Sequence, residues 1–599
     1  MKKRNSPLFA LLLLAILAGL SSCAVNPRCP TALLPIIEVQ VNNSASTHDD
    51  YIGTGSSSAC RARISNVNKF GGGQNFPGGV EVEVRNRKLS TDLNISTTSL
   101  GIGAAFFATL PADGSWSNFF IRGNALSTVD KSAILEIATA GISCNEVVLT
   151  RKGLMVTGAP PIPNTRPQVE IEVGSVSNLD DYITWSPSFC RMKWVNPPNS
   201  LATLGVRVQN MSGTNRLRFS DIQPATGTTA INTTANLTLL GDGTWTSFYV
   251  AGYYGANTNI PSTNASTNDK DAVFEVSETS SGNLLAREGI MVRIRKHVNA
   301  LTPQERDRYL EALREVHETY KFYMLFKDSH SQGLPGSTLM HIQAHGGSAF
   351  LPWHRAFVLH LERLIQSSDP SAALPYWHFD VSSPGMFNAD FIGSNNATNW
   401  VTLSSTNPIS TWQIPAEIVG IRRKTPYGNA GKPSVASETA TLGLGTTFAA
   451  FKSMEVSTHN GAHSTSVVPG SGTWLGDPSI ATQDPLFYFL HCNVDRLWAK
   501  WQWAKKTLDA TLVDGYDRQG SYTSSPTPPG LRLGQYVDDT LWPWDNVTGG
   551  TGTAARPATA PLTPFPITLG GLMPGSNPTI KLTVDFRVIN FGYDDVFPY

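Results

Sequence analysis

The sequence predicts a multidomain protein in which two tandem all-β sandwich domains precede a mainly α-helical domain. The chain has 599 residues, more than one hydrophobic core usually organises at roughly 150 residues per domain. Residues 30–297 contain two similar segments in which apolar and polar residues alternate, as in half-buried strands. From about residue 300 onward, helix-capping signals and apolar residues at helical spacing replace that alternation.

Residues 1–22 have the features of an export signal. A basic start at Lys2 and Lys3 precedes an apolar run, residues 8–20, that is too short to span a bilayer as a permanent helix. Residues 20–23, Leu-Ser-Ser-Cys, resemble a bacterial lipobox, which predicts cleavage before Cys23 and lipid attachment to it. We therefore expect an exported lipoprotein anchored in the periplasm or at the cell surface. Ordinary signal cleavage and secretion is the alternative.

Composition excludes one class of partner and limits the disulfides. The 46 Lys and Arg residues equal the 46 Asp and Glu residues, so no basic excess recruits nucleic acid. Export favours disulfides, but the cysteines that remain without Cys23 are odd in number, so at least one stays a thiol. We expect Cys60 to pair with Cys144 inside one domain, and Cys492 to be a small buried hydrophobe.

The two β segments repeat one another. IIEVQV, DDYI and Cys60 recur as VEIEV, DDYI and Cys190, and ADGSWSNFFIRG around Trp116 returns as GDGTWTSFYVAG around Trp245. We expect sandwiches at residues 30–158 and 168–297, joined by the proline-rich spacer at residues 158–168. Neither repeat contains a catalytic constellation. They are expected to act as a stalk, or to bind a surface polymer or a partner protein through their loops.

A helical domain is predicted for residues 300–599. Thr302, Pro303 and Glu305 form a capping box at its first helix. Apolar residues then recur at helical spacing, which predicts a buried stripe. Further helices are expected at residues 353–366, 448–463 and 486–506, an irregular covering loop at 524–569, and a strand at KLTVDFRV, residues 581–588.

Histidines at metal-ligand spacings gather in this domain. They lie in HGGSAFLPWHRAFVLHLE from His345, HNGAH from His459, and DPLFYFLHCNVD from residue 484. His459 and His463 stand four apart, on one face of a helix. A zinc protease would carry glutamate directly after the first histidine, where Asn460 stands. A donor set made only of imidazoles favours copper.

These motifs resemble the two copper-binding signatures of the tyrosinase family, the type-3 copper proteins that include catechol oxidases and hemocyanins. The resemblance covers about residues 300–599 and implies a four-helix bundle around two copper ions. One copper would be bound by His345, His354 and an upstream histidine, for which we choose His330 over His341 and His317, the last interpreted as a solvated helix position. The implied ligands of the other are His459, His463 and His491.

The resemblance also implies roles for neighbouring residues. Asp495 would orient an imidazole or pair with Arg496, while Arg355 and Glu362 would join helices by ion pairs. His360 and His378 are expected to be non-ligands; His378 stands where the family usually has aspartate, and Asp380 would replace that aspartate. Gln343 occupies the position of a cysteine that many relatives cross-link to a ligand, which resembles the bacterial branch.

The implied reaction is the ortho-hydroxylation of monophenols, the oxidation of o-diphenols to o-quinones, or both, with dioxygen. Because a phenol with a pKa near 10 is mostly neutral at pH 7, hydroxylation needs a base, and Glu455 with Asn460 resembles the pair that holds a basic water in some relatives. An oxidase limited to o-diphenols or o-aminophenols and a hemocyanin-like dioxygen carrier are the alternatives. A plugging domain after the last predicted strand, which a carrier would need, is not expected.

Access to the site is expected to be limited by residues 469–480, where Trp474, Leu475 or Ile480 would contact a substrate ring. If the sandwiches shield the site, removing residues up to about His297 should raise activity.

Overall fold

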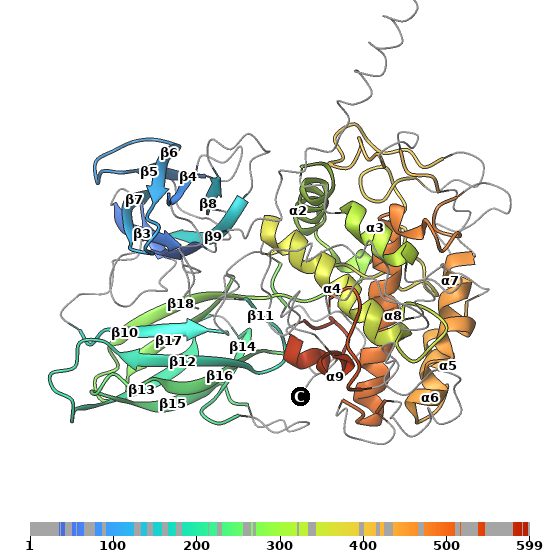
Figure 1. Cartoon of the computed structure of the whole chain (residues 1–599). Helices are drawn as coiled ribbons and strands as arrows, with labels where there is room; N and C mark the ends of the chain where they lie inside the picture. Colours follow the sequence, from blue (N-terminus) through green and yellow to red (C-terminus); the bar gives the residue numbers. More distant parts are fainter. Residues whose placement is uncertain are drawn as a thin grey trace, which may run out of the picture.

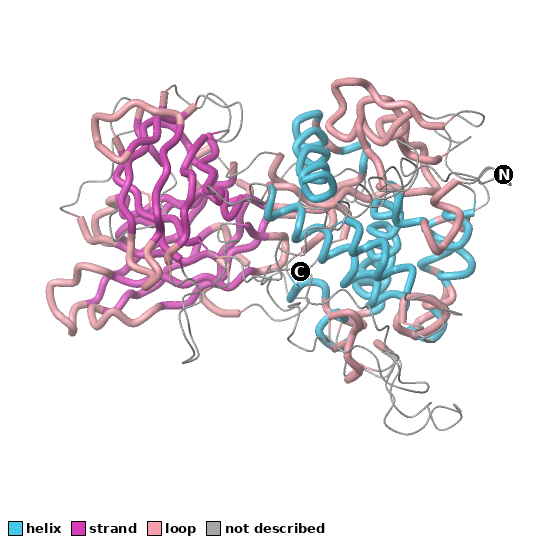
Figure 2. The backbone as a smooth tube through the Cα atoms, turned by 45° about the horizontal axis from the view of Figure 1, so that its top comes forward, coloured by secondary structure: helices cyan, strands magenta, loops and turns pink. Residues whose placement is uncertain are grey.

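The computed structural model contains a β part and a helical part that lie side by side (Figures 1 and 2). It describes residues 35–596 with gaps, of which the longer ones are residues 42–50, 65–77, 125–132, 140–147, 158–165, 175–181, 224–230, 255–264, 333–342, 424–434, 465–472, 517–536 and 545–578. The predicted export signal and lipobox, and most of the proline-rich spacer and of the covering loop, lie outside the described residues. None of the helices described is long and apolar enough to cross a lipid bilayer.

The first group of strands forms two facing sheets. Its strands are β1 (Ile37–Gln40), β2 (Tyr51–Gly53), β3 (Ser58–Ile64), β4 (Val80–Asn86), β5 (Leu93–Ser96), β6 (Ala105–Leu110), β7 (Ser117–Gly123), β8 (Ala133–Thr139) and β9 (Val148–Thr157). The sheet orders are β1-β3-β7-β5 and β2-β9-β8-β4-β6, with β2 and β9 parallel. Side chains from both sheets, among them Cys60, Val82 and Ile121, form one buried core.

A second pair of sheets has the same topology. Its strands are β10 (Val169–Val173), β11 (Tyr182–Ile183), β12 (Ser188–Trp194), β13 (Thr203–Asn210), β14 (Leu217–Ser220), β15 (Thr234–Leu240), β16 (Thr246–Gly252), β17 (Ala272–Glu278) and β18 (Leu284–Val292). They are ordered β10-β12-β16-β14 and β11-β18-β17-β13-β15. On β12, Cys190 and Met192 point into the core while Arg191 and Lys193 face outward, which is the alternation expected of a half-buried strand.

The cysteine expectations are partly tested. Cys60 on β3 lies opposite Phe119 on β7, and Cys190 on β12 lies opposite Phe248 on β16, both buried. Cys144 lies outside the described residues, so its pairing with Cys60 stays a prediction. Cys492 is a buried thiol whose Sγ lies 3.6 Å from the carbonyl oxygen of Leu374, as expected of a small core side chain.

Short and long helices make up the rest of the chain. They are η2 (Val298–Ala300), α2 (Pro303–Arg314), the π-helical turn η3 (Glu315–Thr319), α3 (Tyr323–Gln332), α4 (Phe350–Ser368), α5 (Glu438–Leu442), α6 (Phe448–Phe451), the π-helical turn η4 (Glu455–His459), α7 (Asn460–Ser464), η5 (Ala481–Gln483), α8 (Leu486–Lys505), α9 (Ile580–Val584) and η8 (Phe586–Ile589). The predicted capping box at Thr302 is present, with reciprocal bonds between Thr302 and Glu305. The long helices α4 and α8 form the centre of this domain, and their predicted positions are confirmed.

Two expectations about the helical domain are wrong. The helix predicted for residues 448–463 is divided into α6, η4 and α7, and the π-helical turn between the two α segments ends at His459. The strand predicted at KLTVDFRV is instead α9 followed by η8. Ile580, Thr583 and Val584 are buried there while Lys581 and Leu582 face solvent, so burial follows a helical spacing of three and four, not two.

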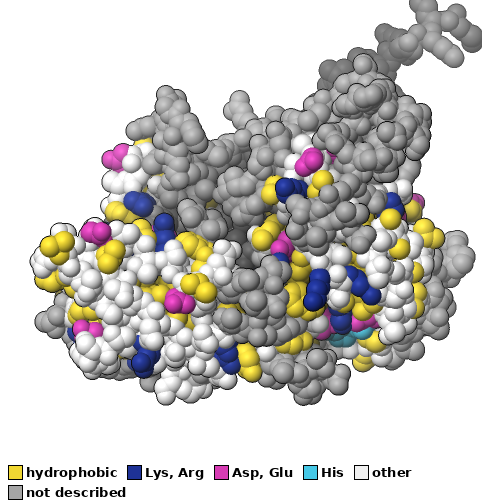
Figure 3. Space-filling model, turned by 90° about the horizontal axis from the view of Figure 1, so that it is seen from below, with side chains coloured by type: hydrophobic (Ala, Val, Ile, Leu, Met, Phe, Trp, Pro, Cys, Tyr) yellow, Lys and Arg dark blue, Asp and Glu magenta, His cyan; other side chains and the backbone are white. Residues whose placement is uncertain are grey.

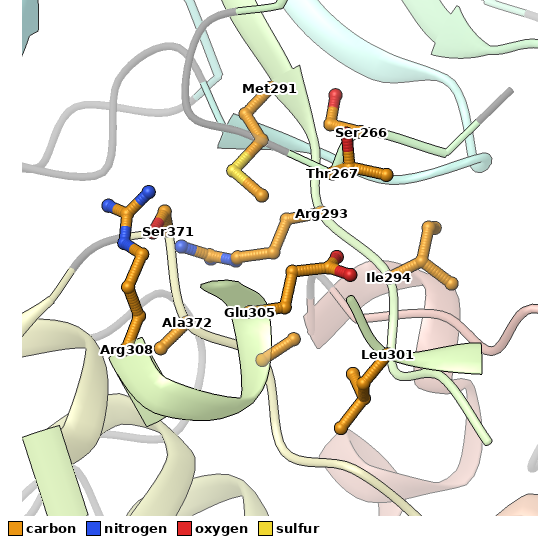
Figure 4. A pocket seen from close by; sticks show the side chains of 11 residues that line it. Ser266, Thr267, Met291, Arg293, Ile294, Leu301, Glu305, Arg308, Ser371 and Ala372 are labelled. Carbon is orange, nitrogen blue, oxygen red and sulfur yellow. The ribbon is translucent and has the colours of Figure 1, made fainter. Parts of the chain in front are cut away.

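The β part and the helical part meet along a close seam. The chain leaves β18 at Val292 and pairs with the C-terminal segment, where Arg295 donates its backbone N–H to Gly592 and Asp594 donates to Arg295. Figure 4 shows side chains from both parts projecting into the seam around a cavity of about 20 Å³. That volume holds about one water molecule, so this cavity leaves little free space between the two parts.

The described surface shows no field of one charge on the face drawn in Figure 3, where acidic and basic side chains are interspersed.

Candidate metal centre

Three histidines form a first group. His330 lies on α3, His345 on the loop before α4, and His354 in the first turns of α4. One ring nitrogen of each lies within 4.8 Å of the others. The ring centroids of His330 and His345 are 4.9 Å apart, and those of His345 and His354 are 5.1 Å apart. A single ion between them would reach all three.

A second group is formed by His459 at the end of η4, His463 on α7 and His491 on α8. The Nε2 atom of His491 lies 3.2 Å from that of His459 and 3.1 Å from that of His463. The π-helical turn places His459 so that both members of the HxxxH pair face α8.

The two groups face each other across one small space. The rings of His354 and His491 are stacked, with centroids 4.1 Å apart, and the centroids of His345 and His459 are 6.2 Å apart. Phe350 contacts His354 and His459, while Phe487 stacks on His491 and contacts His330. Both phenyl rings are buried and touch both groups, so they line the space between them with apolar surface.

Backbone acceptors fix which nitrogen faces inward. Nδ1 of His354 lies 2.9 Å from the carbonyl oxygen of Phe350, and Nδ1 of His463 lies 2.7 Å from that of Leu475. Nδ1 of His459 faces the carbonyl of Glu455 and the side-chain oxygen of Asn460, 3.3 and 3.0 Å away. Each Nδ1 thus carries the proton and leaves an Nε2 lone pair pointing inward.

The nitrogen atoms fit a cation. In the second group, the Nε2 atoms of His459 and His463 are lone pairs facing His491, and one ring proton cannot satisfy all three. In the first group, Nε2 of His354, Nδ1 of His345 and both ring nitrogens of His330 are buried without a hydrogen-bond partner. Buried polar atoms left unpaired are costly. A metal that accepts imidazole nitrogen would relieve both groups, and copper suits such a donor set.

Burial keeps these rings neutral. Loss of hydration, followed by the repulsion of neighbouring histidines, lowers the pKa of His330 to about 3. The same causes lower the pKa of His345, His354, His459 and His491 well below the usual value. Neutral imidazole is the form that binds metals, so the site is ready to bind metal at physiological pH.

Glu455 and Asn460 flank the second group. Glu455 is half-buried and accepts the backbone N–H of Gly346 at 2.8 Å. Burial raises the pKa of its carboxyl group, although the bond from Gly346 opposes this. Asn460 is exposed and contacts His459 through its side-chain oxygen. The carboxylate therefore lies between the loop of His345 and the helix of His459.

The predicted role of Asp495 is wrong in both forms. It contacts neither an imidazole nor Arg496. Instead it accepts Nε of Arg355 and Nη1 of Arg295, and the hydroxyl of Tyr593 donates to it. The pair of Arg355 with Asp495 joins α4 to α8, which confirms the predicted helix tie.

Glu362 forms its ion pair with Arg295 of the connector after β18, not with another helix.

The remaining histidines do not join either group among the described residues. His317 was expected to be solvated, but it is buried, stacked on Trp412, with Nε2 2.7 Å from the carbonyl oxygen of Gln413. His360 accepts from Nε1 of Trp544, and His378 lies 2.8 Å from Asp380 and 2.9 Å from Glu438. His341 lies outside the described residues.

The expected access loop is only partly described. Trp474 and Leu475 are fully buried, and the carbonyl group of Leu475 accepts the hydrogen bond from Nδ1 of His463. Ile480 is partly buried. Trp474 is therefore a core side chain here, not a surface for a substrate ring.

Sequence reasoning missed the contacts made by Arg295 and Tyr593, by Gln343 and by Phe487. Arg295 and Tyr593 surround Asp495, although each lies far from it along the chain. Gln343 bonds to the segment around Trp542. The aromatic run LFYF before His491 was the available signal for Phe487, since such rings pack beside buried sites.

Comparison with known proteins identifies the helical region. Residues 311–443 and 424–504 match the family model described as the common central domain of tyrosinase. A tyrosinase of Streptomyces antibioticus is 27% identical over 283 residues, which covers 43% of this chain and 94% of that protein. A G-type hemocyanin of Enteroctopus dofleini, units Oda to Odg, is 26% identical over 267 residues, covering 39% of this chain and 8% of that protein.

Among solved structures, a tyrosinase from Burkholderia thailandensis at high pH is similar, with 18% identity and a TM-score of 0.28. The matched region covers 44% of this chain and 70% of the Burkholderia thailandensis protein.

Proposed function

Because residues 311–504 belong to the tyrosinase family of dicopper oxidoreductases, we propose that this protein uses dioxygen to oxidise phenols. In this proposal it hydroxylates monophenols at the ortho position, oxidises o-diphenols to o-quinones, or does both. The observation that carries the proposal is the convergence of two three-histidine groups on one water-poor space. One copper ion would be held by His330, His345 and His354, and the other by His459, His463 and His491.

When bound, two adjacent copper ions would supply the two-electron change that the oxidation of a diphenol by dioxygen requires. The chain contributes position and electrostatics. The carbonyl groups of Phe350 and Leu475 hold the Nδ1 protons of His354 and His463, which aims each Nε2 inward. Phe350 and Phe487 keep water out and strengthen every charge interaction inside.

Glu455 is the proposed base of the hydroxylation. A monophenol must lose its proton before it can bind as a phenolate, and its pKa near 10 requires an acceptor. The Glu455 carboxyl group accepts the N–H of Gly346, the residue after His345, and Glu455 lies four residues before His459. Burial raises the pKa of this carboxyl group toward the range in which a carboxylate accepts protons more readily. With Asn460, it would hold the water that takes the proton.

The test combines copper quantitation with a small phenol panel. The protein should bind two equivalents of copper, convert catechol to o-quinone, and oxidise tyrosine after a lag. His491→Asn should lose copper and activity, whereas His360→Gln, which alters a buried histidine outside both groups, should retain them. Protein that binds fewer than two copper ions, or that never forms a quinone, would contradict the proposal.

Two alternatives remain as outcomes of the same panel. Turnover of catechols or o-aminophenols without any turnover of tyrosine would restrict the enzyme to o-diphenols and their analogues. A hemocyanin is among the similar proteins, and a colour change with dioxygen but no quinone would indicate a carrier.

We further propose that the protein is exported and anchored by lipid at Cys23, and that it is of the bacterial type. The support is the LSSC sequence after the apolar run, and Gln343 at a position that many relatives fill with cysteine. Membrane fractionation of the wild type against Cys23→Ser tests the anchor: the variant should leave the membrane. If both proteins fractionate alike, the anchor is refuted.

A further inference from the structure

His345 is held differently from the other five histidines. Four of those five lie within helical segments, α3, α4, α7 and α8, and His459 ends the π-helical turn η4. His345 lies in an irregular stretch, residues 343–349, where no helical hydrogen bonds fix its backbone. It is also only partly buried, and its Nδ1 has no hydrogen-bond partner. Its position must therefore come from bonds made by neighbouring residues.

Gln343, two residues before His345, supplies such bonds. Its side chain is fully buried. Its Nε2 donates to the carbonyl oxygen of Thr540 at 3.0 Å, and its Oε1 accepts the backbone N–H of Trp542 at 2.8 Å. The amide thus pairs with residues 540–542 as a neighbouring strand would, using both a donor and an acceptor.

The partner segment is itself fixed. Within the strap, residues 537–544, the carbonyl of Trp542 accepts Nε1 of Trp353, the residue before His354, at 2.7 Å. At its other end, Asp539 and Val537 accept the N–H groups of Ile580 and Lys581 at 2.9 and 2.8 Å. The strap therefore connects α9 to the start of α4 and gives Gln343 a rigid partner.

A second bond holds the loop on the far side of His345. Gly346 donates its N–H to Glu455, and Gly346 has a φ of +76°. Positive φ favours glycine and turns the chain sharply. His345 is thus held between one anchor to the strap and one anchor to the second group.

We propose that Gln343 is a positioning residue for the first metal: by binding the strap, it holds His345 at the distance that completes the group with His330 and His354. This inference rests on the proposed function for the identity of the metal. Partners that orient metal ligands typically change metal affinity by 10–100-fold when removed. We expect metal affinity to fall at the first group and not at the second, because all three histidines of the second group lie on helical elements.

The matched control is Gln502 on α8. It is equally buried, and it also uses both ends of its amide, donating to the carbonyl of Val584 at 2.7 Å and accepting from Nη2 of Arg355 at 3.0 Å. Gln343→Met and Gln502→Met remove the same number of buried bonds and keep a similar volume. A general loss of stability would affect both variants alike.

Two measurements test the proposal. In a chelator titration, Gln343→Met should hold one copper as tightly as the wild type and the other about 10–100-fold more weakly, and the half-loaded protein should show the EPR signal of an isolated cupric ion. Gln502→Met should keep both affinities within about threefold of the wild type. Equal weakening of both sites, or the same pattern in both variants, would overturn the proposal.

Hydrogen exchange of the metal-free protein provides the second measurement and does not depend on copper. Gln343→Met should speed exchange at residues 344–348 at least about tenfold while leaving α8 unchanged. Unchanged exchange at residues 344–348 would refute the role of Gln343 even if the copper proposal stands. Conversely, suppose that Gln343→Met speeds exchange at residues 344–348 but the protein binds no copper. That result would support the role of Gln343 in holding this loop and would refute only the proposed function.

Discussion

The same kind of arginine contact occurs on the second sandwich and inside the helical domain, in opposite surroundings. On the sheet surface, Arg191 pairs with Glu172 and covers the ring of Trp245 at 4.5 Å, with its side chain 35% exposed. In the helical domain, Arg295 pairs with Glu362 and covers the ring of Phe591 at 3.9 Å, but is only 1% exposed. The chemistry is alike, so any difference in energetic effect must come from burial.

Because it is buried, the ion pair of Arg295 should matter more for folding stability than the exposed pair of Arg191. Water and salt screen an exposed pair, which contributes about 0–1 kcal/mol. A buried carboxylate that loses its partner has no water to replace it and costs about 3–5 kcal/mol. Arg295 serves two such carboxylates, Glu362 on α4 and Asp495 on α8. The connector after β18 therefore belongs structurally to the helical domain, although it precedes it in sequence.

Truncation should give the largest effect. Removing residues 1–167 takes away only the first sandwich, and the product should fold and bind metal. Removing residues 1–297 also removes Arg295, takes the ion pair from buried Glu362 and one of the two arginine partners from Asp495, and should give insoluble or unfolded protein.

Unfolding after the removal of residues 1–297 would contradict the expectation that this truncation raises activity by uncovering the site. In Figure 1 the strands lie away from α7, which carries His463. Circular dichroism and copper content of the two truncated proteins decide the matter. An active, soluble protein that starts at residue 298 would show that the connector is dispensable.

Substitution of Arg295 alone should cost about 3–5 kcal/mol of unfolding free energy, because Arg295→Met leaves two buried carboxylates without their shared partner. Denaturant unfolding measures it. The variant Arg295→Met/Glu362→Gln also neutralises the Glu362 side chain that lost its ion pair, and it should recover part of the lost unfolding free energy. A loss below about 1 kcal/mol for the single variant would place Arg295 in the same class as Arg191.

The histidine groups were predictable because their information is local. His459 and His463 are four residues apart, and His345 lies inside a long motif, so spacing and resemblance indicate them without knowledge of tertiary contacts. The copper domain and the β region were predictable for the same reason. The four-helix bundle stays a prediction: α3, α4, α7 and α8 carry four of the six histidines, but His345 lies on a loop and His459 on η4.

The partners of Asp495 were not predictable. Its motif indicates a functional carboxylate, but the choice between an imidazole and an arginine depends on residues 200 and 98 positions away, Arg295 and Tyr593. The strand predicted at the end of the chain failed for another reason. Alternation of apolar residues there was real, but contacts of Ile580 and Val584 with the core selected the helical spacing instead.

Acid should weaken the connector through His297. Burial, and then the charges of His378 and Arg496, lower the pKa of this ring to about 4, against an ordinary value near 6.5. Because the folded pKa is depressed, the stabilisation is present above pH 6.5 and is lost as pH falls toward 4, at about 3 kcal/mol in total.

The variant His297→Asn should flatten the pH dependence of unfolding between pH 6.5 and 4 in the metal-free protein. His378 is the control of opposite sign: although burial alone would lower its pKa, hydrogen bonds to Asp380 and Glu438 raise it. The contribution of His378 to the unfolding free energy is therefore present at low pH and lost as pH rises through its pKa in the folded protein. Equal pH slopes for wild type and His297→Asn would exclude the histidine as the cause.

The smallest effect is expected on the sheet surface. Arg191→Ala removes an exposed ion pair and one cation–π contact, each worth about 0.5–1 kcal/mol or less at such sites. Lys193 still covers Trp245 at 4.4 Å, so the ring keeps a cation and the loss should stay below about 1 kcal/mol. Moderate salt should reduce the effect further, because it screens exposed charges, whereas the cost of Arg295→Met should persist in salt. Denaturant unfolding of both variants at low and high salt measures this contrast, and a salt-insensitive loss of several kcal/mol at Arg191 would mean that burial does not separate the two arginines.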